Sequence, residues 1–586
     1  MKLRTEWNLG LMYASPSDPK IERDTKAYEK ACESFARKYA KNKNYTTSAG
    51  QLLKAITEYE ALEALPNPII YFYLFLDING GHKVAEANKS STLQRLTKAS
   101  NHILFFHLSL AAIPAKQQKA FLVDPKLKDV RYFLKRIFDS SKYNLSEAEE
   151  KILNLKSIVA REKWIEGQEK LLGKQTISWQ GKTMPIAEAQ GKIKELPTKQ
   201  RYELHSLVMQ KYMAISDFAE SEINAVVIDK KINDELRGYK MPYSATIFHY
   251  QNDEKAVESL VATTTKYFHI AHRFHKIKAK MLGLPKLRYA DRAASVGGTV
   301  KKISYDEARV LVQKAFASLG QKYEDVFMRY LENGQIDVFP KVGKKSGAYC
   351  WTNINRPTYV LLNHIDNLNS VMILAHEMGH AIHCEFSKSQ RPMYQGHSTA
   401  VAEVASTLFE NFAFEEVLKT LSDKEKIVAL HDKISDDIST IFRQIACFNF
   451  ETELHATIRN KGSMSKEDIA KLMNKHMKAY LGPAFDLKDE DGYFFVTWSH
   501  IRSFFYVYSY AYGQLISKAL YKKYQEDPSY LSKIEQFLYA GESMSPEDIF
   551  KSAGIDTTKP GFFEAGLMSI EDDIKRLETM LKKQKK

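Results

Sequence analysis

The strongest constraint on the fold is the spacing of apolar residues, which recur every three or four positions through most of the chain. Charged residues fill the positions between them, so each such stretch would form a helix with one apolar face. The chain is therefore expected to be mainly α-helical, and the sequence contains no internal repeat and no long low-complexity linker. The pattern is clearest in residues 18–43, 84–113, 146–172, 197–236, 253–282 and 305–332.

Two stretches interrupt the helical pattern. Residues 176–185 have the composition of two short strands around a Gly-Lys turn, and residues 333–363 combine Gly, Pro and β-branched residues. The first predicts a boundary between an N-terminal helical domain, 1–175, and a larger helical domain, 176–586. The second predicts a small β-sheet within the larger domain. A length of 586 residues alone suggests several domains, but the continuous helical pattern favours one large two-lobed body.

The chain carries an excess of positive charge, with 85 Lys and Arg against 71 Asp and Glu and a formal charge of +14. Such an excess raises nucleic acid as a partner. The sequence has no zinc-finger spacing, no RNP-like aromatic motif and no Walker loop, however. A basic helical nucleic-acid-binding protein is therefore only a remote alternative, and no nucleic-acid partner is expected.

The cysteines and the apolar runs indicate the cellular compartment in which the protein is expected to work. Four scattered cysteines are too few for a disulfide framework, which favours a reducing environment. The first residues lack the apolar core of a signal peptide, and the longest apolar runs, 69–76 and 103–114, are too short to span a membrane. We therefore expect a cytoplasmic protein with no membrane partner. The four cysteines are Cys32, Cys350, Cys384 and Cys447.

One helical stretch contains residues that are suited to metal binding and catalysis. In the run Leu-Ala-His-Glu-Met-Gly-His-Ala-Ile-His, His376 and His380 are four residues apart and so lie on one face of a helix. Two imidazoles at that spacing can bind one Zn²⁺. Glu377 lies beside them, where it can hold a zinc-bound water and take its proton. The competing interpretation is an amphipathic helix with two ordinary histidines, so a third ligand has to be found.

A glutamate on the next helix is the best candidate for that third ligand. Glu385 faces the opposite side of the first helix and is a poor choice. Glu403 is flanked by Ala and Val, and we expect it to be nearly buried, where a metal would compensate the cost of burying its charge. Glu410 lies on the same face as Glu403 and suits an acceptor for a ligand imidazole N–H. The zinc site therefore spans residues 376–410.

The metzincin pattern does not apply. It requires Gly at position 383 and His at position 386, and this chain has His383 and Phe386. Three protein ligands and one open position are typical of a catalytic zinc site rather than a structural one. Domain 176–586 is therefore expected to be the catalytic domain.

Several motifs resemble those of oligoendopeptidase F, a family among the thimet oligopeptidase-like M3 zinc metallopeptidases. They are Glu-Trp-Asn-Leu-Gly-Leu-Met-Tyr from Glu6, Ser-Gly-Ala-Tyr from Ser346, Tyr-Val-Leu-Leu-Asn from Tyr359, the histidine motif, and Ala-Glu-Val-Ala-Ser-Thr-Leu-Phe-Glu from Ala402. The resemblance implies a mainly helical fold with a deep channel around one zinc ion. It also implies cleavage of short peptides, with His376, His380 and Glu403 as ligands and Glu377 as base.

An aromatic segment downstream is the second informative stretch. The family has a His followed by several tyrosines here, which matches His500 and the tyrosines after it; such groups can donate to the oxyanion of a tetrahedral intermediate. Thimet-type members carry Tyr where this chain has Phe505. Tyr508 ranks first as donor, followed by Tyr510 and Tyr506. The alternative for several of these aromatics is ordinary core packing.

The expected function is that of a zinc metalloendopeptidase that cuts internal bonds of short peptides and holds one Zn²⁺ per chain. A zinc carboxypeptidase on a similar helical scaffold is the alternative. The expected partners are short peptide substrates, and the expected state is a monomer or a small homo-oligomer.

Overall fold

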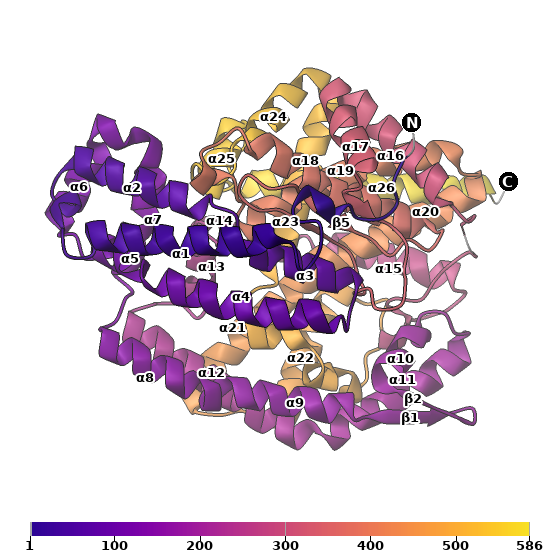
Figure 1. Cartoon of the computed structure of the whole chain (residues 1–586). Coiled ribbons are helices and arrows are strands. Elements are labelled where there is room, and N and C mark those ends of the chain that lie inside the picture. Colours follow the sequence, from indigo (N-terminus) through magenta and orange to yellow (C-terminus); the bar gives the residue numbers. More distant parts are fainter. Residues whose placement is uncertain (1–2, 299, 585–586) are drawn as a thin grey trace. The chain divides into compact units, whose positions relative to one another are not determined.

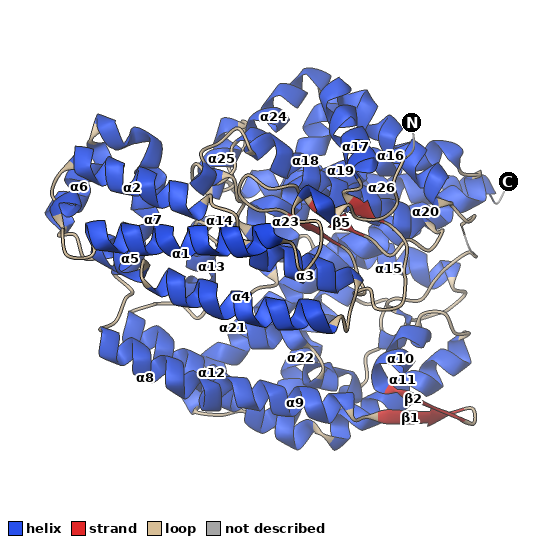
Figure 2. Ribbon diagram, in the orientation of Figure 1, coloured by secondary structure: helices blue, strands red, loops and turns tan. Residues whose placement is uncertain are grey.

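The computed structural model describes residues 3–298 and 300–584, and helices form most of them, as predicted (Figures 1 and 2). The chain divides into two compact units. The first consists of Met1–Asn144, Lys302–Lys419 and Ser529–Gly554, and the second of Leu145–Lys301, Thr420–Pro528 and Ile555–Lys586. The division at residues 175 and 176 expected from the sequence falls inside the second unit. The division into domains 1–175 and 176–586 therefore stays a prediction.

The first unit contains the N-terminal helices and those that carry the histidine motif. Its helices are α1 (Pro19–Tyr39), α2 (Ala49–Glu63), α3 (Pro68–Ile78), α4 (Lys83–Asn101), α5 (Leu104–Ala111), α6 (Ala115–Val123), α7 (Arg131–Ser141), α16 (Tyr305–Leu319), α17 (Gln321–Asn333), α18 (Leu368–Ser387), α19 (Thr399–Thr420), α24 (Leu531–Tyr539) and α25 (Pro546–Ser552).

The second unit contains the aromatic segment and a β-hairpin. Its helices are α8 (Glu147–Ser157), α9 (Lys163–Gly173), α10 (Ile186–Ile193), α11 (Thr198–Ala214), α12 (Ser216–Arg237), α13 (Ser244–His249), α14 (Glu254–Lys266), α15 (Phe268–Met281), α20 (Asp423–Asp437), α21 (Arg443–Lys461), α22 (Lys466–Leu481), α23 (Tyr508–Glu526) and α26 (Pro560–Gln584).

The helix ends follow the capping residues of the sequence. Asp18 caps α1 by accepting from the backbone N–H of Lys20, and Ser146 and Glu149 form a reciprocal capping box at α8. Most of the long periodic stretches are two helices rather than one. The stretch 305–332, for example, is divided at Gly320, whose φ of 130° is outside the helical region. Periodicity finds the apolar face, but it does not show where the backbone turns.

The small sheet lies against the helix that carries the histidine motif, as predicted. It consists of β3 (Ile336–Asp337), β4 (Tyr349–Trp351) and β5 (Tyr359–Leu361) in the order β3-β5-β4. Strand β5 pairs in parallel with β3 and antiparallel with β4, and both β4 and β5 contact α18. The Trp7 indole donates to the Val360 carbonyl over 2.8 Å, which fixes the N-terminal segment to this sheet.

The predicted hairpin is also present in the second unit. Strands β1 (Thr176–Trp179) and β2 (Lys182–Pro185) pair antiparallel. The connecting residues are Gln180 and Gly181, with φ values of 49° and 75°, so Lys182 already belongs to the second strand. Two successive positive φ values are typical of the tight hairpin turn that matches the twist of the strands.

Residues Ala49–Ile78 form the one stretch of the described chain that is long and apolar enough to cross a membrane by length and composition. The structure divides this stretch into α2 and α3, with residues 64–67 between them. Leu52 and Ile56 of α2 are fully buried in one hydrophobic cluster, and Phe72 of α3 is fully buried in another. The apolar residues of this stretch therefore supply the core of the first unit.

Candidate metal centre and active site

Helix α18 fixes the two histidines of the motif. Asn367 caps it by accepting from the backbone N–H of Ser370 over 2.8 Å. Its apolar face, which includes Val371 and Leu374, is fully buried, so the opposite face is held in a set orientation. His376 and His380 project from that face with their ring centroids 4.9 Å apart and their planes at 84°.

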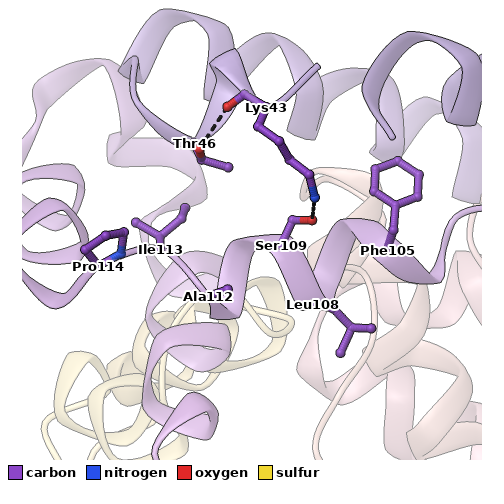
Figure 3. Close-up of a pocket in the computed structure, with 8 residues that line it drawn as sticks. All are labelled: Lys43, Thr46, Phe105, Leu108, Ser109, Ala112, Ile113 and Pro114. Atoms are coloured by element: carbon purple, nitrogen blue, oxygen red, sulfur yellow. Dashed lines mark hydrogen bonds between the residues drawn. The ribbon is translucent and has the colours of Figure 1, made fainter. Parts of the chain in front are cut away.

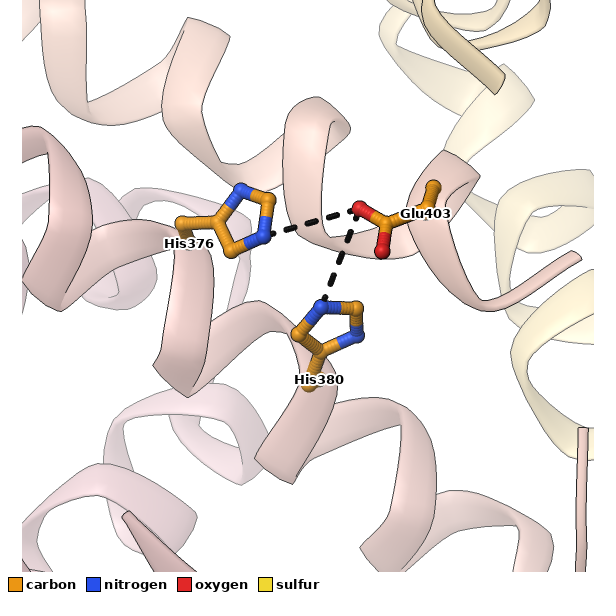
Figure 4. A group of neighbouring side chains, drawn as sticks. All are labelled: His376, His380 and Glu403. Carbon is orange, nitrogen blue, oxygen red and sulfur yellow. Dashed lines mark ion pairs between the residues drawn. The ribbon is translucent and has the colours of Figure 1, made fainter. Parts of the chain in front are cut away.

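Glu403 reaches the same point from α19. Its Oε2 lies 3.6 Å from His376 Nε2 and 3.9 Å from His380 Nε2 (Figure 4). Within residues 3–298 and 300–584, this is the group of three possible metal ligands whose donor atoms all lie within 4.8 Å of one another. Donors bound tetrahedrally to one Zn²⁺ are separated by about 3.3–3.5 Å. Two imidazole nitrogens and a carboxylate oxygen at these distances therefore fit a zinc ion.

The expectation that Glu403 is nearly buried is wrong, because about a third of its side chain (36%) is exposed. The buried face of α19 is formed by neighbours such as Val401, Val404 and Ala405, and Glu403 lies beside that face rather than on it. The cost of burial therefore does not explain why a carboxylate stands at this position. Its closeness to the two histidine nitrogens does.

A second carboxylate orients one of the histidines. The Nδ1 atom of His376 is hydrogen-bonded to Glu410, which lies seven residues beyond Glu403 on the same face of α19. This leaves Nε2 of His376 to face Glu403, which is the arrangement of a histidine ligand held by an outer carboxylate. Burial acts to lower the pKa of His376, but Glu410 more than offsets it and the pKa is raised to about 9. A metal that binds His376 through Nε2 therefore has to compete with a proton for that nitrogen.

Replacement of Glu410 by Gln is expected to weaken zinc binding about 10- to 100-fold, since the ligand imidazole loses its charged acceptor. Competition with a chromophoric chelator measures that affinity. Glu416→Gln is the matched control, because Glu416 is on the same helix and pairs with Lys419 instead. Equal zinc affinity in the Glu410→Gln variant and the unchanged protein would contradict the orienting role.

Glu377 lies between the metal centre and the sheet. It is buried, and burial raises the pKa of its carboxyl to about 7; the nearby His376 acts to lower it, and Glu403 and Glu410 act to raise it. A backbone hydrogen bond from Cys350 in β4 also acts to lower the pKa. The sheet thus holds the carboxylate that follows the first histidine. A carboxylate with a pKa near neutrality is suited to accept a proton and return it.

Glu385, which the helical spacing excludes as a ligand, faces α17. It contacts Arg329 Nη2 over 2.6 Å and the Tyr330 hydroxyl over 2.9 Å. The two glutamates of α18 therefore have different neighbours: Glu377 lies beside the metal centre, and Glu385 pairs with residues of α17.

The predicted oxyanion donors belong to the second unit. His500 lies in a short 3-10 helix, Ser499–Ser503, just before α23. Its Nε2 is 3.3 Å from the Tyr510 hydroxyl, and its ring stacks on Tyr506 with centroids 5.6 Å apart. The Tyr506 hydroxyl donates to that of Tyr510 over 2.9 Å. His500, Tyr506 and Tyr510 therefore form one connected group.

Tyr508 is placed differently from the other two tyrosines. Its side chain is fully buried, and its hydroxyl donates to Asn252 Oδ1 over 2.9 Å. The sequence ranks Tyr508 first as donor, but its hydroxyl donates to a buried partner in the core. We therefore now place Tyr510 ahead of Tyr508 as the proposed donor.

The turn between His500 and α23 is strained, which the sequence did not reveal. Phe504 and Phe505 have φ values of 45° and 58°, a region that costs a bulky residue about 1–3 kcal/mol. Phe505 is fully buried, and its backbone N–H donates to Glu451 Oε1 over 2.6 Å. Glu451 thus fixes this turn from 54 residues away on α21, a contact that sequence reasoning missed. Strain of this kind gathers at functional sites.

A separate pocket of the first unit contains none of the predicted site residues (Figure 3). It has a volume of about 420 Å³, and the Lys43 ammonium donates to the Ser109 hydroxyl within it. It is lined by Lys43, Thr46, Phe105, Leu108, Ser109, Ala112, Ile113 and Pro114. The metal centre, and not this pocket, is the candidate active site.

Comparison with known proteins gives the family. Residues 170–569, more than half of the chain, match the model of peptidase family M3, and residues 110–172 match that of oligopeptidase F. The chain is 26% identical over 577 residues to an oligoendopeptidase F homolog of Borreliella burgdorferi, covering 95% of both chains. It is 30% identical over 357 residues to oligopeptidase PepF of Bacillus subtilis, which is 60% of this chain but only 53% of that protein.

A solved structure agrees with the helical architecture. The crystal structure of oligoendopeptidase-F from Enterococcus faecium superposes with a TM-score of 0.68 at 20% identity, covering 96% of this chain and 98% of that one. Together with the sequence matches, the resemblance found from the motifs alone is confirmed: the chain belongs to peptidase family M3.

Proposed function

We propose that this protein is a zinc-dependent endopeptidase that hydrolyses internal bonds of short peptides. The observation that carries the proposal is the cluster of His376, His380 and Glu403, with Glu377 beside it on α18. The distances between their donor atoms suit one Zn²⁺. Relatives named oligoendopeptidase F support the class of reaction.

Zinc would be held by His376 Nε2, His380 Nε2 and Glu403 and, when bound, would supply a Lewis acid to polarise the scissile carbonyl. Glu377 accepts the proton of the attacking water and passes it to the departing amine. Glu410 keeps His376 in the orientation for binding. His500 and Tyr510 are the proposed hydrogen-bond donors to the oxyanion, ahead of Tyr506 and Tyr508.

The competing proposal is a zinc carboxypeptidase with the same donor set. The two differ in where the substrate is cut and not in the metal site, so the products distinguish them. We further propose that the enzyme works in the cytoplasm, as a monomer or small homo-oligomer, on peptides rather than nucleic acid. Its four cysteines are all free, as a reducing compartment favours.

Digestion of a mixed peptide library, read by mass spectrometry, tests the proposal. We expect internal cuts in short peptides, loss of all cutting after treatment with a zinc chelator, and recovery when zinc is returned. Stepwise loss of C-terminal residues would favour the carboxypeptidase. Cutting that persists after the metal has been removed to background would contradict both.

A further inference from the structure

The end of helix α3 is fastened to the loop that leads into strand β4. The Tyr349 hydroxyl donates to Asp77 Oδ2 over 2.6 Å, and the backbone N–H of Lys345 donates to the Asp77 carbonyl over 2.7 Å. The Lys345 ammonium lies 3.5 Å from the same carboxylate oxygen and 5.1 Å from the centre of the Tyr349 ring. Asp77 therefore ties α3 to a strand that begins 272 residues further along the chain.

Three more hydrogen bonds hold the same loop. The backbone N–H of Gly80 donates to the Gly343 carbonyl over 2.7 Å. A Cβ atom at Gly80 would lie only 2.9 Å from that carbonyl oxygen, so the two backbones are in direct contact. On the side of the sheet, the Asn363 amide donates to the carbonyls of Lys345 and Gly347 over 3.0 and 2.7 Å. The loop therefore enters β4 along one fixed path.

The link between Asp77 and Tyr349 is largely buried. About a quarter of the Asp77 side chain (25%) is exposed, and Tyr349 packs against the hydrophobic cluster that α3 shares with β5 (Figure 1). Burial and the Asp77 carboxylate both raise the pKa of Tyr349, so its hydroxyl stays protonated and donates. A hydrogen bond to a carboxylate in such surroundings is stronger than one between neutral groups, and its loss leaves a polar group without a partner.

Strand β4 passes beside the proposed catalytic base. The backbone N–H of Cys350, the residue after Tyr349, is hydrogen-bonded to the Glu377 carboxyl. In the order β3-β5-β4, β4 is an edge strand, so the N–H groups that do not pair with β5 can point towards α18, which β4 contacts. This N–H belongs to the peptide group that joins Tyr349 to Cys350. The anchored tyrosine therefore sets the position of the donor that holds Glu377.

We propose that Asp77 is a positioning residue of the active site, which acts through Tyr349 to hold the Cys350 N–H, and with it the Glu377 carboxylate, in place at the metal centre. The inference rests on the proposed function, because it gives Asp77 a part in that reaction. A base takes up a proton only over a short distance, and a misplacement of 1 Å can lower a rate about 10²-fold. A helix from the segment 1–175, outside the predicted catalytic domain, would thus support the chemistry.

Steady-state cleavage of a quenched fluorescent peptide by the full chain tests this role. Asp77→Leu removes the acceptor at similar size, and kcat is expected to fall about 10-fold or more. KM should stay within about 3-fold, since the base acts in the chemical step, and the zinc content should not change. Asp77→Asn keeps an oxygen that can accept from Tyr349 and should restore most of kcat. An unchanged kcat in the Asp77→Leu variant, with or without a higher KM, would overturn the proposal.

Two further variants show whether the effect passes through Tyr349. Asp24→Leu is the matched control, because Asp24 also accepts from a tyrosine, Tyr13, over 3.1 Å in the same unit. It should lose a similar bond and keep its kcat. Tyr349→Phe removes the proposed link from its other end, so kcat should fall as in Asp77→Leu, and the double variant should fall no further. Losses that add in the double variant would contradict action through Tyr349.

Hydrogen exchange provides a readout that does not depend on peptide cleavage. The Cys350 amide is expected to exchange at least about 10-fold faster in Asp77→Leu and Tyr349→Phe than in the unchanged protein, whereas Asp24→Leu should leave its exchange as it is. Unchanged exchange in the first two variants would overturn the positioning role whether or not the protein cuts peptides. Faster exchange in a protein that cuts no peptide would support the link and count against the proposed function alone.

Discussion

Replacement of Glu377 by Gln is expected to abolish peptide cleavage while zinc stays bound. The change removes the proton acceptor and keeps the size of the side chain, and it does not alter His376, His380 or Glu403. A positioned general base contributes about 10²–10⁴-fold to a rate, so the loss should be at least of that order. Hydrolysis of a quenched fluorescent peptide gives the rate, and elemental analysis of the purified variant gives the zinc content.

The second glutamate of the same helix, Glu385, provides the control. Glu385→Gln removes a carboxylate eight residues further along α18 that pairs with Arg329, so it should leave cleavage intact. Near-normal cleavage by the Glu377→Gln variant would refute the proposed base. Loss of zinc together with activity would show instead that Glu377 is needed to hold the metal centre together.

The local parts of the site could be predicted from the sequence because they depend on one helix. A spacing of four residues is enough to place His376 and His380 on the same face of α18. Glu403 could be chosen only from its neighbouring residues and from the resemblance to a family, since its distance from the two histidines depends on how α19 crosses α18. Its burial is predicted wrongly because an Ala-Val neighbourhood does not reveal which side of the helix the residue occupies.

The parts that could not be predicted depend on contacts distant in sequence. The ranking of the tyrosines needed Asn252, which holds the Tyr508 hydroxyl from 256 residues away. The strained turn at Phe504 and Phe505 needed Glu451 on α21. The two compact units could not be read from segment order either, because each combines three separate stretches of chain. Apolar periodicity identifies helices and their buried faces, but it does not show which helices pack against each other.

The meeting of α18 and α19 leads to a second large expected effect, at Gly379. A Cβ atom at this position would lie 2.8 Å from the Ser406 Cα and 3.2 Å from the Ala405 carbonyl oxygen. Both are backbone atoms of α19, so the clash can be relieved only by separating the two helices. Gly379→Ala is therefore expected to lower the free energy of unfolding by about 1–3 kcal/mol, although alanine is the better helix former.

The same displacement should weaken zinc binding, because Gly379 lies between the two histidines and Ser406 is three residues from Glu403. Moving the helices apart lengthens the 3.6 and 3.9 Å separations between the Glu403 carboxylate and the histidine nitrogens, and a metal site tolerates shifts of only about 0.5 Å. Thermal unfolding and zinc competition measure the two effects. Gly191→Ala in α10 is the control, since a Cβ there meets nothing within 4 Å and should be neutral or stabilising. Normal zinc affinity in a destabilised Gly379→Ala variant would contradict this coupling. It would show that the position of Glu403 relative to the histidines does not depend on close packing of α18 against α19.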